Sequence, residues 1–178
     1  MPIFKQVVMT FDKRFDTRTC RHSLNGENYV LHCHHFTTLY SQLAEDAKDF
    51  GGVKMLRETA EDSFYNTLKR YYADNNITNP TDKVRIAEEY YSCIGLGKIS
   101  FASVGEVSGH VVLSRSHVDE GWIKKFGKRE QPVNYITHGY VTAVFSLLND
   151  QSVRSFTATE VKSIVAGAPE SEIQVYKN

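Results

Sequence analysis

The sequence has few of the features that mark secreted, membrane-spanning or nucleic-acid-binding proteins. It holds three cysteines among 178 residues, an odd and sparse set that makes a poor disulfide framework. No apolar run reaches the roughly 18 residues of a membrane-spanning helix, and the first residues lack the pattern of a signal peptide. Lys plus Arg and Asp plus Glu each number 21, so the basic excess typical of nucleic-acid binders is absent. We therefore expect a cytoplasmic protein with no membrane span and no nucleic-acid partner.

What is present is typical of a globular protein. Apolar residues make up 41% of the chain and charged residues 24%, values that argue against wholesale disorder. The length suits one domain with a small appendage. We predict a single domain over residues 1–178, in which residues 1–35 form a strand-and-hairpin extension and residues 36–178 form the main body.

Helical periodicity dominates the first half of that main body. Phe36, Leu39, Tyr40 and Leu43 recur with the spacing of one helix face, and Gly51-Gly52 is predicted to end this helix.

Three further helices and a short helical piece are expected downstream. One helix covers about residues 56–71, one begins after Pro80 with Thr81 as its N-cap, and one covers about residues 132–148. The short piece carries Trp122.

Alternating apolar residues predict strands at both ends of the chain. A strand is expected over residues 6–11, and Asn25-Gly26 indicates a hairpin turn before a strand at 29–31. Two more hairpins are expected over residues 99–113 and 154–176. The order predicts an α+β fold, in which an antiparallel sheet of about four to five strands packs against about four helices.

The block His32-Cys33-His34-His35 is the most unusual feature of the sequence. Imidazole and thiolate are good ligands for transition metals such as Zn²⁺ or Fe²⁺, so His32, His34 and His35 form a candidate metal site. The alternative is that these residues cap the start of a helix and pack under loops, because their spacing matches no standard zinc signature.

From Ser114 onward the chain resembles a known family. The residues that carry the likeness are Ser116–Trp122, Phe126-Gly127, Gln131–Asn134, Gly139-Tyr140, Glu160–Ser163, Gly167 and Ser171. Their order resembles the 4-vinyl reductase domain, a small-molecule-binding domain that also forms the sensory part of phenol- and xylene-responsive transcription activators. The resemblance covers roughly the last 65 residues. It implies a fold shared with the TRAPP trafficking subunits, a homodimer formed through helices, and a small hydrophobic or aromatic ligand.

The family often holds a structural zinc, and the corresponding positions depart from its pattern. They are Asn134, Glu160, Ser163 and Ser171, of which only the glutamate matches. Hydroxyl and amide groups are poor zinc ligands, so we expect no zinc there. We expect the three substituted residues to bond the last hairpin to the helix at 132–148 instead.

The resemblance also implies a ligand pocket near Ser116–Trp122. The candidate lining residues are His117 and Trp122, with Tyr140 and Phe101 as further walls. His117 is the strongest candidate because it offers a polar tip beside apolar surface, whereas Trp122 is equally well explained as a core residue.

Three functions follow as hypotheses. The first is non-catalytic binding or sensing of a small hydrophobic or aromatic molecule, because no residue pattern in the sequence demands catalysis. The second is a metal-binding protein or metal-dependent enzyme centred on the histidine block. The third is a dimeric assembly subunit, which a large exposed apolar patch on the first two helices would favour.

Overall fold

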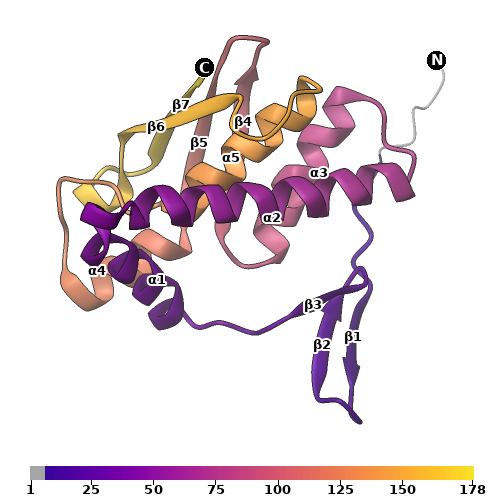
Figure 1. Cartoon of the computed structure of the whole chain (residues 1–178), viewed down its shortest axis with the longest axis horizontal. Coiled ribbons are helices and arrows are strands. Elements are labelled where there is room, and N and C mark those ends of the chain that lie inside the picture. The colour runs from indigo at the N-terminus through magenta and orange to yellow at the C-terminus, as the bar shows by residue number, and fades with distance from the viewer. Residues whose placement is uncertain (1–6) are drawn as a thin grey trace.

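The computed structural model describes residues 7–178 and contains two antiparallel sheets. The larger sheet has the order β4 (Gly97–Val104), β5 (Ser108–Ser116), β7 (Ser171–Lys177) and β6 (Phe156–Lys162). The smaller sheet has the order β1 (Lys13–Asp16), β2 (Arg21–Leu24) and β3 (Glu27–Tyr29), and it projects away from the body as an arm (Figure 1). We refer to residues 13–29 as the hairpin arm.

Five α-helices complete the described part of the chain. They are α1 (His34–Asp46), α2 (Gly52–Asp74), α3 (Pro80–Cys93), α4 (His117–Phe126) and α5 (Tyr135–Leu148), with short 3₁₀ turns η1 (Lys48–Phe50) and η2 (Ile164–Ala166). The predicted α+β class is thereby confirmed. Along residues 7–178 we find no helix whose length and hydrophobicity would let it cross a bilayer.

The core lies between the larger sheet and α5, with α2 laid across the outer side of α5 (Figure 1). Helix α5 is mainly apolar and buried on all sides, with twelve of its fourteen residues buried. A helix with this pattern must be covered on every face. The sheet contributes alternate residues of each strand to this core, because successive side chains point to opposite faces. Val111 of β5 and Ile173 of β7, for example, are paired and fully buried.

The structure corrects the expected strands near the N-terminus. Residues 7–11 form no strand, and Gln6 lies outside the described residues. The amides of Met9 and Thr10 instead donate to the Glu89 carboxylate (2.8 Å) and the Tyr71 hydroxyl (2.9 Å). The strand expected at 29–31 ends at Tyr29.

Two helix boundaries also differ from the prediction. The first helix ends at Asp46, and Gly52 starts α2 because Gly51 turns the chain with a φ of +79°. Asn79, and not Thr81, caps α3: its side-chain oxygen accepts a 2.8 Å hydrogen bond from the Thr81 amide.

Helix α1 has the predicted period, but its apolar face points outward. Its buried residues are Thr37, Thr38, Ser41 and Ala44. They lie against α4 so closely that a Cβ on Gly121 would come within 2.7 Å of Thr38 Oγ1. Small side chains permit this close approach, which leaves the larger apolar residues of α1 exposed.

Candidate ligand-binding site

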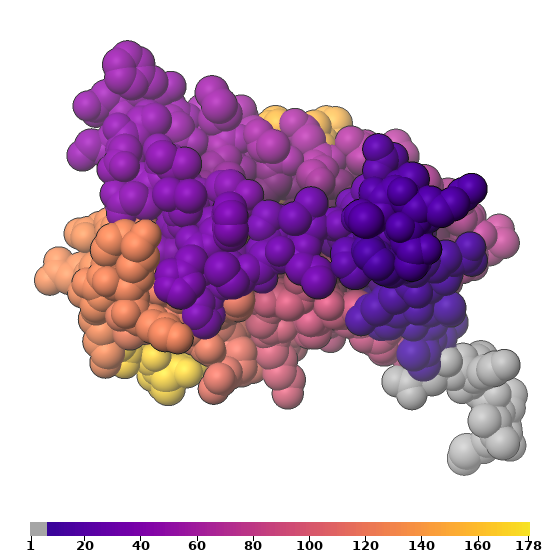
Figure 2. Space-filling model, turned by 90° about the horizontal axis from the view of Figure 1, so that it is seen from below, coloured from indigo at the N-terminus to yellow at the C-terminus, as the bar shows by residue number. Residues whose placement is uncertain are grey.

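A cavity of about 650 Å³ lies between the hairpin arm and the helices. This volume is within the range of about 300–1,000 Å³ that small-molecule sites usually have. We call it the arm cavity. The arm and the segment that leads from it to α1 lie on the face of the molecule that Figure 2 shows, in indigo and purple. The main apolar and aromatic side chains that line the cavity are Leu24, Tyr29, Val30, Leu31, Tyr40, Phe64, Ile94, Leu96 and Ile136.

His117 is the predicted ligand residue that reaches this cavity. It is the first residue of α4, and its amide donates to the Leu96 carbonyl oxygen at 2.9 Å. Ser116 caps the same helix by accepting from the Asp119 amide at 3.1 Å. Burial and the neighbouring His34, whose ring centroid is 5.4 Å away, lower the pKa of His117. The backbone contacts place His117 at the start of α4, and its neutral imidazole can donate to or accept from a ligand.

The other three candidates lie in packed interior. Tyr140 is fully buried and donates its hydroxyl to the Ala87 carbonyl oxygen at 2.5 Å. Phe101 packs against Phe145 with ring centroids 6.1 Å apart. Trp122 belongs to a small separate core with Val118, Val133 and Val165. The sequence identified these residues as apolar walls, but the walls that they form belong to the core and not to the arm cavity.

The histidine block divides between two environments. His32 lines the arm cavity, with its ring 5.7 Å from Phe36 and 5.8 Å from Tyr40. His34 contacts His35 and His117, whereas the His35 side chain is exposed to solvent. Across residues 7–178, no three His, Cys, Asp or Glu side chains are arranged to hold a metal ion. The geometry therefore gives the metal hypothesis no support.

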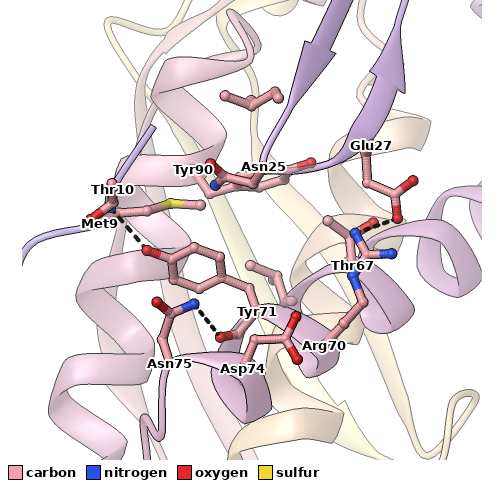
Figure 3. A pocket seen from close by; sticks show the side chains of 12 residues that line it. Met9, Thr10, Asn25, Glu27, Thr67, Arg70, Tyr71, Asp74, Asn75 and Tyr90 are labelled. Atoms are coloured by element: carbon pink, nitrogen blue, oxygen red, sulfur yellow. Dashed lines mark hydrogen bonds and ion pairs between the residues drawn. The ribbon is translucent and has the colours of Figure 1, made fainter. Parts of the chain in front are cut away.

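The sequence did not indicate that the hairpin arm would form a wall. The Asn25-Gly26 signal predicted the turn correctly, but a turn signal says nothing about where the hairpin docks. The base of the arm and the segment before it contact α2 around a second, smaller pocket of about 180 Å³ (Figure 3). There Arg70 of α2 forms an ion pair with Glu27 of β3, and Tyr71 accepts from the Thr10 amide.

A buried polar cluster contains Asn134, Glu160, Ser163 and Ser171, the positions that the sequence resemblance aligned with a zinc site. The Asn134 amide nitrogen donates to Asp119 at 2.7 Å and to Glu160 at 3.1 Å, while Ser116 donates to the Asn134 oxygen at 2.7 Å. Glu160 also pairs with His138 Nε2 at 3.2 Å. Asn134 thus links the start of α5 to β6, as expected.

The serines of this cluster do not reach α5. Ser171 accepts from the Ile164 amide at 2.9 Å and lies 3.4 Å from Asp119 of α4. Ser163 is buried just after β6. Asp119, Ser116 and His138 are further members that the sequence did not indicate; a single acidic residue in a helical turn, such as Asp119, gives no sign that it is buried.

The comparisons with known proteins show the fold. No protein-family model and no curated protein matches the chain. Among solved structures, the phenol-responsive sensory domain of the transcription activator PoxR with phenol matches with a TM-score of 0.76 and 15% identity. That match covers 93% of this chain and 84% of the other.

A second solved structure is a trafficking protein particle complex subunit 3 from Naegleria fowleri covalently bound to palmitic acid. It matches with a TM-score of 0.53 and 12% identity, over 82% of this chain and 94% of the other. The fold expected from the sequence is therefore the one found.

Proposed function

We propose that the chain binds a small apolar or aromatic molecule in the arm cavity and catalyses no reaction. The observation that carries this proposal is a cavity with mainly apolar walls whose lining includes the imidazole of His117 at the start of α4, besides those of His22 and His32. Such sites combine apolar area for affinity with a few polar groups for orientation. The shared fold with a sensory domain whose structure contains phenol supports the same class of ligand.

Phenol is the first probe to test, because its ring suits the apolar walls and its hydroxyl suits His117. Calorimetric titration should detect saturable binding. His117→Ala should weaken it about 5- to 10-fold, the usual effect of one lost hydrogen bond.

The matched control is His110→Ala. His110 is also partly exposed, but it lies on β5 beside Glu172 and outside the arm cavity. This variant should bind phenol like the parent, whereas Ile136→Trp should narrow the cavity and weaken binding. Equal losses in both histidine variants, or no saturable binding of phenol or toluene, would contradict the proposal.

We further propose that the protein forms a homodimer through the exposed face of α1. Phe36, Leu39, Tyr40 and Leu43 are between 39% and 53% exposed and follow one helix face. Together with Val30 and Leu31 they make an apolar surface that is unusual for a protein acting alone. This feature equally favours the alternative of an assembly subunit.

Sedimentation equilibrium distinguishes these states. Phe36→Glu with Leu43→Glu should raise the dimer dissociation constant more than about 10-fold, because two charges would be buried unpaired. Val161→Glu is the control, since Val161 is 47% exposed on β6. A parent that is monomeric at all concentrations would contradict the dimer.

A further inference from the structure

A second hollow, of about 490 Å³, lies where the start of α2 meets α5 and β6. None of its lining residues belongs to the hairpin arm or lines the arm cavity. Its walls carry four cationic side chains, those of Lys48, Lys54, Arg57 and Arg154. We refer to it as the cationic cleft.

Among the residues that line this cleft, Arg57 is the partly buried cation that forms no ion pair, whereas Lys48 is exposed. Its side chain is partly buried, and its Nε is fully buried without a hydrogen bond. Within residues 7–178 no carboxylate oxygen lies within 4.0 Å of its guanidinium, which packs over the Tyr135 ring at 5.5 Å. Withdrawing a charge from water without a compensating partner is costly.

The acidic residues of the cleft are already engaged by Arg154. Glu61 accepts from both the Arg154 amide (2.8 Å) and its guanidinium (2.9 Å). Glu58 lies 3.5 Å from the same guanidinium. Both lining carboxylates are therefore already paired, with Arg154 and, for Glu58, also with Lys54, and the four cations of the cleft outnumber them by two.

His138 supplies a second unpartnered group, and its side chain is only 4% exposed. Its Nε2 lies 3.2 Å from the Glu160 carboxylate, and its Nδ1 has no hydrogen-bond partner. Because a carboxylate accepts, the neutral imidazole carries its proton on Nε2. The Nδ1 lone pair is then a buried acceptor without a donor, on a side chain that lines the cleft.

The packing of α2 on α5 fixes these two groups relative to each other. A Cβ on Gly139 would come within 2.3 Å of the Arg57 carbonyl oxygen, so the two helix backbones touch at this point. Arg57 and His138 therefore project from elements that cannot shift independently. The first turn of α2 adds to the positive potential, because it has no acidic residue and no side-chain cap.

We propose that the cationic cleft binds a small anion that carries a hydroxyl group. Arg57 would hold its carboxylate or phosphate oxygens, and His138 Nδ1 would accept its hydroxyl proton. Lys48 and Lys54 would attract the anion to the opening of the cleft.

The test uses glycolate, acetate and orthophosphate, which are too polar to occupy the arm cavity. Amide NMR shifts of residues 53–57 and His138 report binding at low ionic strength. We expect saturable shifts with glycolate at about 5-fold lower concentration than with acetate, because acetate lacks the donor for His138. If only orthophosphate gives saturable shifts, the anion that the cleft binds is a phosphate and not a carboxylate.

Arg57→Met should weaken binding at least 10-fold while keeping or raising the melting temperature, because it removes an unpaired charge and keeps the length of the side chain. Lys69→Gln is the matched control: it removes one charge from the same helix, also beside a tyrosine ring, outside the cleft. It should bind like the parent.

If Arg57→Met does not fold, Lys48→Gln with Lys54→Gln should weaken binding several-fold. The proposal fails if none of the three anions gives saturable shifts up to about 50 mM, since a site that needs more than this binds only very weakly. It also fails if Arg57→Met, or the double lysine variant in its place, binds as tightly as the parent. Neither outcome depends on phenol binding in the arm cavity.

Discussion

The two ends of the chain use apolar side chains in opposite ways. The larger sheet and α5 bury most of theirs, and α5 has Tyr140, Val144 and Phe145 fully enclosed. The hairpin arm, its linker and α1 leave Val30, Leu31 and Leu43 more than half exposed. Densely packed residues determine the fold, whereas exposed apolar residues beside a cavity provide surface for a ligand or a second copy.

The largest expected effect tests this contrast directly. Tyr140→Ala removes a buried ring and its hydrogen bond to Ala87, and it should lower the free energy of unfolding by about 4 kcal/mol. Leu43→Ala should change the unfolding free energy of the monomer by less than about 0.5 kcal/mol. Urea unfolding at low protein concentration measures both values. Comparable losses would show that α1 is covered in the monomer.

The buried polar cluster gives the next largest effect, which depends on pH. Burial raises the pKa of Asp119 from its usual 3.8 to about 6. Its folded-state pKa lies above its unfolded value, so ionisation costs stability as pH rises from about 4 to 6. The full cost above pH 6 is roughly 3 kcal/mol.

Asp119→Asn removes this titration and keeps an oxygen to accept from Asn134. The stability of the variant relative to the parent should rise between pH 4 and 7, by up to roughly 3 kcal/mol. Urea unfolding across that range gives the difference. A difference that stays constant with pH would mean that Asp119 does not titrate in this range.

The sequence predicted most of the elements because their signals are local. The 3.6-residue period of α2 and α3 and the alternation in β4 to β7 each depend on neighbours in the chain. The cap of α3 was misassigned because Asn79 and Thr81 are both good N-cap residues. Pro80 at the first helical position decides between them in favour of the residue before it.

The candidate site was predicted less completely because it depends on long-range packing. His117 reaches the cavity, but Trp122, Tyr140 and Phe101 do not. The exposed face of α1 could not be inferred from periodicity, since a helical period indicates that one face is apolar and not which face is covered. Nothing in the sequence indicated that Arg57 lacks an ion pair. The carboxylates near it in the chain, Glu58 and Glu61, are paired with Arg154, which is far away in the sequence.

The cap of α3 contributes less to stability than the buried residues above. Asn79→Ala should lower the free energy of unfolding by about 1 kcal/mol, because the Thr81 amide loses its acceptor. Thr81→Ala, the control, should cost less than half as much. Thermal unfolding of the two variants at one pH measures the difference. A larger loss of stability in Thr81→Ala would indicate that Thr81 is the N-cap, as the sequence predicted.

The smallest effect concerns the attachment of the N-terminal segment that precedes the hairpin arm. Tyr71→Phe removes the acceptor for the Thr10 amide, which is exposed to solvent and can bond to water instead. We expect less than about 1 kcal/mol of global destabilisation, because the exposed amide is not left unsatisfied. Amide hydrogen exchange should nevertheless accelerate at Thr10 and stay unchanged in α5. Faster exchange in α5 as well would show that the N-terminal segment and the core unfold together. The two ends of the chain would then differ in how densely they pack, but they would unfold as one cooperative unit.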